Sequence, residues 1–173
     1  CKHIRVELDK MGVEWRPCGL ETGTLATIQG GKPGKTMLLR ADMDALRIQE
    51  ETGLEYASVN DGLSHACGHD CHMAMLLTTV QVLKDMKEEL CGTVRFAFQP
   101  SEEIGTGGKS MVAGGAMDGV DGCFGVHVWA DVPSGKVSVE AGPRMAACDM
   151  FKIYVTGKSC HGAQPHQGVD PVV

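Results

Sequence analysis

Apolar residues recur along the chain in short runs whose spacing alternates between that of helices and that of strands. From Cys71 to Leu90 they recur at three- and four-residue steps, the spacing of a helix with one buried face. KTMLLRA is a short apolar run, and TVRFAFQ is rich in β-branched and aromatic residues, as buried strands are. This alternation predicts an α/β fold with a mainly parallel sheet flanked by helices.

Shorter segments complete the pattern. Glycine, proline and polar residues mark where the chain turns. The further elements expected, in chain order, are a short helix ending at Met11, strands near 13–16 and 24–29, a turn at GGKPG, a polar loop over 49–64, a glycine-rich helix in GGKSMVAGGAM and a strand in GCFGVHVWA.

From Gly135 onward the pattern changes. GKVSVEAG and DMFKIYVTG have the composition of strands, with no long helix between them. We therefore expect a first domain over residues 1–146 and the first part of a smaller α+β domain over residues 147–173. The chain opens inside an amphipathic helix and ends in GVDPVV, which suggests an internal fragment of a longer protein.

Composition and charge exclude several functional classes. Hydrophobic residues make up 43% of the chain and charged residues 22%, as in ordinary globular proteins. A net charge of -6 argues against a nucleic-acid partner. No apolar run reaches the roughly 18 residues that cross a bilayer, so no membrane association is expected. No signal peptide is visible, and the eight scattered cysteines are expected to be reduced thiols of a cytoplasmic protein.

Candidate chemistry lies where the apolar runs end. The carboxyl ends of strands in an open α/β sheet meet at one edge, where ligands bind. Acids, histidines and a thiol occupy these places: Asp42 and Asp44 after LLRA, Glu102 and Glu103 after VRFAFQP, His127 after CFGV, and the SHACGHDCH stretch before the long helix. Four separate loops therefore predict one convergent site.

The SHACGHDCH stretch is open to three interpretations: a structural zinc site, a redox thiol pair, or part of an active site. No second Cys/His pair follows at zinc-finger spacing, and there is no C-x-x-C. The C-x-H pair of Cys67 and His69 suits a metal only if distant loops supply further ligands. His65 and His72 are expected to be capping or solvated side chains at the start of the helix.

Glu102 and Glu103 form a pair with two possible roles. Adjacent glutamates after a strand are usually solvated charge. In an extended or turning backbone, however, neighbouring side chains diverge, so that one can hold a metal while the other handles protons. Metal-assisted hydrolysis needs this division.

Several motifs, in order and with matching spacing, resemble one family. They are LLRADMDAL, IQEETGLEYAS, HACGHDCHMAMLL, GTVRFAFQPSEE, GVHV and HGAQPHQGVDPVV. Together they are similar to the amidohydrolase branch of the aminoacylase/carboxypeptidase metallopeptidases, which includes hippurate hydrolases, N-acetyldiaminopimelate deacetylases and auxin-conjugate hydrolases. The resemblance implies a zinc-peptidase-like catalytic domain over 1–146 and the start of a lid and dimerisation domain over 147–173.

The resemblance also implies a site with two divalent metal ions. The implied roles are metal ligands at Cys67, His69, Glu103 and His127, a general acid/base at Glu102, a ligand-orienting carboxylate at Asp44, and at His161 a lid histidine that reaches the substrate of the partner subunit in a homodimer. A fifth ligand of the family, a histidine after the lid, has no counterpart in the 173 residues.

The implied activity is hydrolysis of the amide bond of an N-acyl amino acid, with acetyl, benzoyl or a similar acyl group. A thiolate ligand favours zinc, cobalt or nickel, and manganese also fits this branch. Three alternatives stay open: a non-catalytic metal-binding or dimerisation module of the same fold, a catalytically weak fragment, and a redox protein that uses Cys67 and Cys71.

Overall fold

Five strands pair into one sheet in the computed structural model, which describes residues 1–147 and 149–173. They are β1 (Glu14–Pro17), β2 (Thr24–Gln29), β3 (Lys32–Asp42), β4 (Cys91–Gln99) and β5 (Gly122–Gly125). Their order across the sheet is β1-β2-β4-β3-β5. The predicted turn at GGKPG is shorter than expected, because β3 already begins at Lys32 and absorbs the rest in a register shift before Thr36.

The α/β fold class is confirmed, but the sheet is mixed rather than mainly parallel. β3 pairs in parallel with β4 and β5, whereas β2 pairs antiparallel with β1 and β4. The difference has a topological cause. Parallel neighbours need a crossover, which helices supply between β3 and β4 and between β4 and β5. Only a short loop joins β1 to β2, so these two strands form a hairpin.

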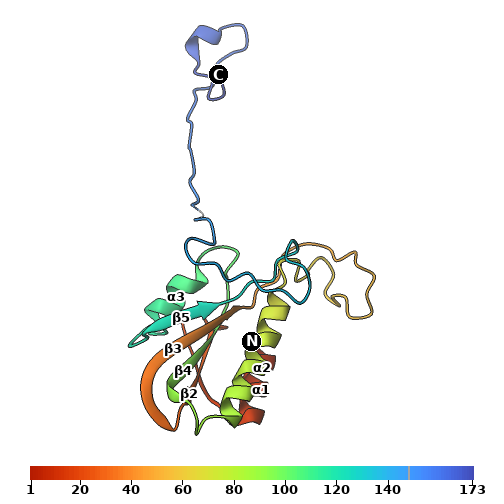
Figure 1. Cartoon of the computed structure of the whole chain (residues 1–173). Helices are drawn as coiled ribbons and strands as arrows, with labels where there is room; N and C mark the ends of the chain where they lie inside the picture. The colour runs from red at the N-terminus through yellow and green to blue at the C-terminus, as the bar shows by residue number, and fades with distance from the viewer. Residues whose placement is uncertain (148) are drawn as a thin grey trace. The chain divides into compact units, whose positions relative to one another are not determined.

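Helices cover both faces of the sheet (Figure 1). The helices are α1 (Lys2–Met11), α2 (His69–Asp85) and α3 (Gly107–Ala113). Side chains of α1 and α2 pack with one sheet face around Leu8, Val80 and Phe96, and α3 packs on the other face through Met111. None of the helices among the described residues combines the length and the apolar character that crossing a bilayer demands.

Two predicted elements end earlier than expected. The long helix stops at Asp85, and the polar residues that follow it form turns that lead into β4. The strand predicted in GCFGVHVWA stops at Gly125, opposite Arg40 of β3. Beyond Gly125 the chain leaves the ladder, so His127 lies in a loop and not on a strand.

The chain divides into two compact units, Cys1–Asp131 and Val132–Val173. The second unit contains a 3-10 turn, η1 (Pro165–Gln167), and an isolated bridge between Lys158 and Val169. The predicted domain boundary after residue 146 stays a prediction.

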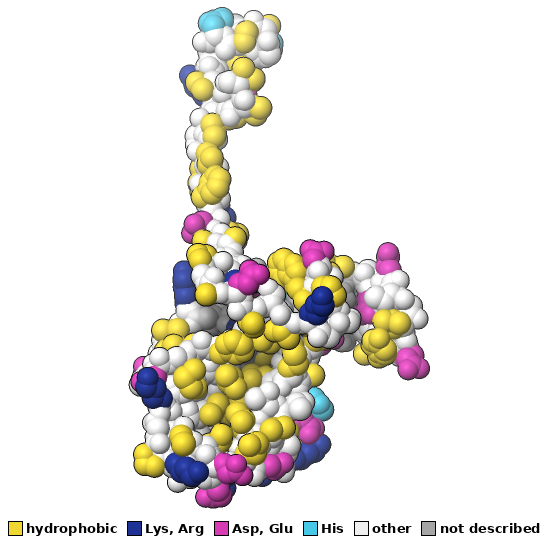
Figure 2. All heavy atoms as spheres, viewed as in Figure 1, with side chains coloured by type: hydrophobic (Ala, Val, Ile, Leu, Met, Phe, Trp, Pro, Cys, Tyr) yellow, Lys and Arg dark blue, Asp and Glu magenta, His cyan; other side chains and the backbone are white. Residues whose placement is uncertain are grey.

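The strands predicted over residues 135–142 and 149–157 are not formed, so this prediction was wrong for the structure described. A strand is stable only when a neighbour accepts its hydrogen bonds. The described residues of the second unit offer these segments no such neighbour, and the apolar side chains of Val137, Val139, Phe151 and Ile153 are exposed. Figure 2 shows hydrophobic side chains along much of the extended part of the second unit.

Candidate metal centre

The predicted metal ligands of the first unit meet at the edge where three parallel strands end. Asp42 is the last residue of β3, and the Glu102–Glu103 pair follows β4. His127 follows β5, and His69 begins α2. The parallel pairing of β3, β4 and β5 places these residues at one edge because each strand runs in the same direction.

Two overlapping groups of potential ligands converge there. The ligand atoms of Cys67, His69 and His127 all lie within 4.8 Å of one another, and so do those of His69, Glu102 and Glu103. The Sγ atom of Cys67 is 3.5 Å from Nε2 of His127. Nε2 of His69 is 3.6 Å from Oε1 of Glu103 and 3.8 Å from Oε2 of Glu102. His69 is common to both groups, an arrangement in which two neighbouring cations can bind.

His69 is buried without hydrogen-bond partners. Its side chain is 0% exposed, and neither ring nitrogen is bonded within the described part of the chain. Leaving a buried polar group unsatisfied costs about 1–3 kcal/mol. A cation at Nε2 would satisfy one nitrogen, and Asp44, whose Oδ1 lies 3.4 Å from Nδ1, can accept from the other. The buried, unpartnered histidine therefore fits a metal site.

Asp44 contacts both Glu103 and His69, which come from different parts of the chain. Its Oδ2 accepts a hydrogen bond of 3.0 Å from the backbone N–H of Glu103. Its Oδ1, which is buried and unbonded among the described atoms, faces His69. One carboxylate thus holds the peptide of Glu103 and faces the outer nitrogen of His69, as carboxylates behind metal-bound histidines do.

The two glutamates lie in the turn after β4 and differ in side-chain exposure. Ser101 takes a left-handed φ of 54°, which is uncommon outside glycine, asparagine and aspartate and turns the chain immediately before the pair. The side chain of Glu102 is 38% exposed, whereas that of Glu103 is 26% exposed and lies against Cys67. By side-chain exposure Glu103 is therefore the more enclosed carboxylate, although Glu103 as a whole residue, backbone included, is the more exposed of the two.

The thiol of Cys67 is surrounded by negative charge. Burial, a hydrogen bond with Glu103 and the charges of Glu103, Glu102 and Asp42 together raise its pKa to about 11. Three carboxylates thus disfavour a fourth negative charge on the thiol, and a bound cation would stabilise all four groups in their ionised form. Burial and Asp70 likewise raise the pKa of Cys71.

His72 is a residue of this site that sequence reasoning misplaced. The sequence predicts a capping or solvated side chain, but the side chain of His72 is 1% exposed, and the N-cap of α2 is Gly68, with no side-chain cap. Its Nδ1 bonds Oδ1 of Asp42 at 2.5 Å, and its Nε2 accepts the backbone N–H of Val128 at 2.9 Å. The sequence spacing does indicate that His72 is buried, because His69, His72, Leu76 and Val80 lie at helical intervals on the buried face.

Asp42, His69 and His72 are also close enough to hold an ion. Both nitrogens of His72 are already bonded, however, so His72 is better described as a hydrogen-bonded support than as a ligand. Burial opposes ionisation of Asp42, but the hydrogen bond from His72 and the charge of Arg40 outweigh it and lower the pKa of this carboxyl. Arg40 donates to Oδ2 of Asp42 at 2.7 Å.

Comparison with known proteins identifies the family of this chain. Residues 38–171 match the family described as Peptidase family M20/M25/M40. The chain belongs to this family. It is 45% identical over 170 residues to an N-acetyl-L-cysteine deacetylase of Bacillus subtilis and 47% identical over 174 residues to thermostable carboxypeptidase 1 of Saccharolobus solfataricus. These matches cover 98% and 99% of the chain but 41% and 44% of the relatives, so it spans about two fifths of their length.

A solved structure of an M20 member agrees with the fold. A Bacillus subtilis protein described as a dinuclear metal binding peptidase of the M20 family superposes with a TM-score of 0.79 at 44% identity. The match covers 82% of the chain and 40% of that protein. The M20 membership and this neighbour support divalent metal ions at the site.

His161 belongs to the second unit of this M20 chain. It is exposed, and its Nδ1 accepts a hydrogen bond of 3.2 Å from the backbone N–H of Ala163. This bond leaves Nε2 as the nitrogen that can donate when the ring is neutral. Its predicted role at the substrate of a partner subunit stays a prediction.

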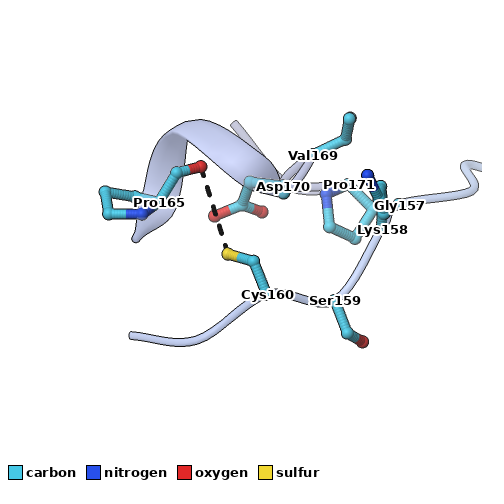
Figure 3. Close-up of a pocket in the computed structure, with 9 residues that line it drawn as sticks. Gly157, Lys158, Ser159, Cys160, Pro165, Val169, Asp170 and Pro171 are labelled. Carbon is cyan, nitrogen blue, oxygen red and sulfur yellow. Dashed lines mark hydrogen bonds between the residues drawn. The ribbon is translucent and has the colours of Figure 1, made fainter. Parts of the chain in front are cut away.

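Residues close to His161 in the sequence line a pocket (Figure 3). Its lining residues are Gly157, Lys158, Ser159, Cys160, Pro165, Gly168, Val169, Asp170 and Pro171. Cys160 makes a long contact of 4.0 Å with the carbonyl of Pro165. The lining of the pocket includes one basic residue, Lys158, one acidic residue, Asp170, and no histidine. The pocket therefore lacks the group of acids and histidines that the first unit has.

Proposed function

We propose that the complete protein is a metal-dependent amidohydrolase that cleaves the amide bond of N-acyl amino acids. The observation that carries this proposal is the pair of ligand groups that share the unpartnered His69. Membership of the M20 family and the deacetylase and carboxypeptidase relatives support it. Both named activities break an amide bond at the nitrogen of an amino acid.

Four side chains are proposed to hold two divalent ions. Cys67 and His127 would serve one ion, Glu103 the other, and His69 lies within reach of both groups. The thiolate favours zinc, cobalt or nickel, and manganese is compatible with the carboxylates and histidines. When bound, such ions supply a water of lowered pKa and polarise the amide carbonyl.

Glu102 is proposed to move the proton. It is the more exposed carboxylate of the pair, 3.8 Å from Nε2 of His69, and so can meet both a water and a substrate. It would accept the proton of the attacking water and then return it to the leaving nitrogen, which releases a carboxylate and a free amino acid. Asp44 would keep Glu103 and His69 in place during both steps.

His161 is proposed to donate from Nε2 to the developing oxyanion, and to do so from the partner subunit of a homodimer. The hydrogen bond between its Nδ1 and Ala163 supports the donor assignment. Preorganised donors of this kind stabilise the charge that develops in the transition state. The subunit arrangement and a cytoplasmic location are inferences from sequence alone.

The redox alternative is disfavoured by the thiols themselves. Reactive cysteines usually have lowered pKa values, because the thiolate is the nucleophile. Burial and the neighbouring acids instead raise the pKa of Cys67 to about 11, and the pKa of Cys71 is raised as well. A non-catalytic metal-binding module differs from the enzyme only in turnover, so an activity assay separates the two.

The test is a metal-dependent assay of the complete protein. We expect hydrolysis of acetyl-, benzoyl- or indoleacetyl-amino acids after loading with zinc or manganese, loss on chelation, and recovery when metal is restored. Dipeptides with a free carboxyl end serve as the competing substrate class. Stoichiometric metal without turnover of any substrate would favour the non-catalytic module, and failure to bind metal would contradict the site.

A further inference from the structure

His72 is a buried histidine that the proposed reaction does not use. Its ring stacks against His69 at a centroid distance of 5.5 Å and meets the His127 ring edge-on at 4.5 Å. Burial of a polar ring is costly unless its nitrogens are bonded. Both nitrogens are bonded, one to a side chain and one to the backbone. The ring therefore links two parts of the site.

The hydrogen bonds fix which nitrogen carries the proton. The backbone N–H of Val128 can only donate, so Nε2 of His72 accepts and Nδ1 carries the hydrogen. Nδ1 then donates to Oδ1 of Asp42, whose other oxygen accepts from Arg40. The Val128 N–H thus donates to His72 and His72 donates to Asp42, which also accepts a hydrogen bond from Arg40.

The next peptide group, which carries the carbonyl of Val128, orients His127. The carbonyl of Val128 lies 2.5 Å from Nδ1 of His127, which leaves Nε2 of His127 facing Sγ of Cys67. The ladder between β3 and β5 ends at Gly125 and does not reach Val128. The hydrogen bond from Val128 to His72 anchors it instead. Val128 also packs on Gly68, where a Cβ would collide with its side chain.

We propose that His72 is a positioning residue of the metal centre, which holds the N–H of Val128 and, through the main chain of Val128, the imidazole of His127. This inference rests on the proposed metal site, since it assumes that His127 is a ligand. It assigns His72 no contact with the ion or the substrate. Supports of this kind typically contribute about 10- to 100-fold to metal affinity.

Two substitutions separate the bonds that His72 makes. His72→Gln carries its amide at the distance of Nε2, so its oxygen can still accept from Val128. His72→Asn is one methylene shorter, so it can donate to Asp42 but stops short of Val128. Leu76→Ala is the matched control, because Leu76 is buried one turn further along the same face of α2 and belongs to the apolar core.

The first readout needs no metal. In the metal-free complete protein, hydrogen exchange of the Val128 amide should be slow with histidine or glutamine at position 72 and fast in His72→Asn. The second readout is cobalt(II) binding, followed by the thiolate-to-cobalt absorption band. We expect His72→Asn to bind cobalt about 10- to 100-fold more weakly and His72→Gln to recover most of that loss. Leu76→Ala should lower the melting temperature while cobalt affinity is retained.

The outcomes separate this role from the metal site itself. Equal cobalt affinity in His72→Asn and the unsubstituted protein would overturn the positioning role, as would an equal loss in Leu76→Ala. His127→Ala tests the underlying assumption. If that variant keeps its cobalt affinity, the proposed metal site fails, whatever the His72 variants do.

Discussion

At the scale of single residues, the site contains negative charges and buried polar atoms that no side chain of the described residues neutralises or bonds. Glu102, Glu103 and Asp42 surround Cys67, and their combined effect appears in the raised pKa of its thiol. His69 has two buried nitrogens without partners. Both features would be costly in a purely structural cluster, and both are relieved by cations.

The two glutamates are expected to differ when substituted. Glu102→Gln removes the proton carrier but keeps the shape, so the complete protein should retain its metal and lose about 10²- to 10⁴-fold in kcat. Glu103→Ala removes a proposed ligand, so metal content should fall first. Metal analysis beside steady-state kinetics measures both effects. Equal metal loss in the two variants would contradict the division of roles.

The thiol of Cys67 gives a pH-dependent prediction. Its pKa of about 11 means that the metal-free native protein holds it protonated at pH 8.5. It should react with iodoacetamide about two orders of magnitude more slowly there than in the unfolded chain, where a thiol titrates near 8.5. The rate should rise as pH approaches 11, and Glu103→Gln should shift that rise to lower pH.

Mass spectrometry of the peptide that contains Cys67 measures this alkylation. The denatured protein is the control, since it has the same thiol without the surrounding carboxylates. Cys67 in the metal-loaded protein should be protected throughout. Rapid alkylation of native, metal-free Cys67 at pH 7 would instead favour a reactive redox thiol.

At the scale of elements, the start of α2 organises the centre. Gly68 precedes the helix with a left-handed φ of 85°, and the side chain of Val128 occupies the space beside it. Within four residues the chain then places His69 among the acids and His72 under Val128. The turn, the helix and the loop after β5 therefore form one packed unit.

Substitution of Gly68 tests this packing. Gly68→Ala adds a Cβ against Val128 in a conformation that costs a non-glycine residue about 1–2 kcal/mol. We expect lower stability and also metal affinity weakened about 10- to 100-fold, because the loop that carries His127 must shift. Gly53→Ala is the matched control, with a left-handed φ of 66° and no atom within 4 Å of the added Cβ.

Isothermal titration with zinc and thermal unfolding together give the result. The Gly53 variant should show the conformational destabilisation alone. If both variants bind zinc as the unsubstituted protein does, the close contact between Gly68 and Val128 has no bearing on the centre.

At the scale of the whole molecule, the two units contrast in how far they are packed. The first has a two-sided core around its sheet, whereas the second exposes apolar side chains over residues that were expected to be strands. His161 lies in this second unit. Its proposed contribution therefore depends on an assembly of the complete protein.

Subunit mixing tests that assembly. We expect His161→Ala and Glu102→Gln to be inactive alone and to regain activity when their subunits are exchanged. In a heterodimer, one of the two sites would combine an intact Glu102 with the partner's intact His161. Random exchange should therefore restore about a quarter of full activity. No recovery after verified exchange would mean that His161 acts within its own chain or has no catalytic part.

The sequence by itself determined the kinds of residue at the site and the elements that carry them. Helical spacing predicted α2, and β-branched and aromatic runs predicted β4, because these patterns reflect local geometry. The ends of the apolar runs located the convergent loops, because parallel strands end together at one edge. The position of the Glu102–Glu103 pair after β4 followed from this rule.

Only the tertiary structure decided how these residues act on one another. The raised pKa of Cys67 depends on carboxylates from two other loops, so no local window contains it. The burial and tautomer of His72 depend on Asp42 and on a peptide 56 positions away. The predicted strands after Gly135 failed for the same reason: a strand forms only where a neighbour completes its hydrogen bonds, and composition does not specify that neighbour.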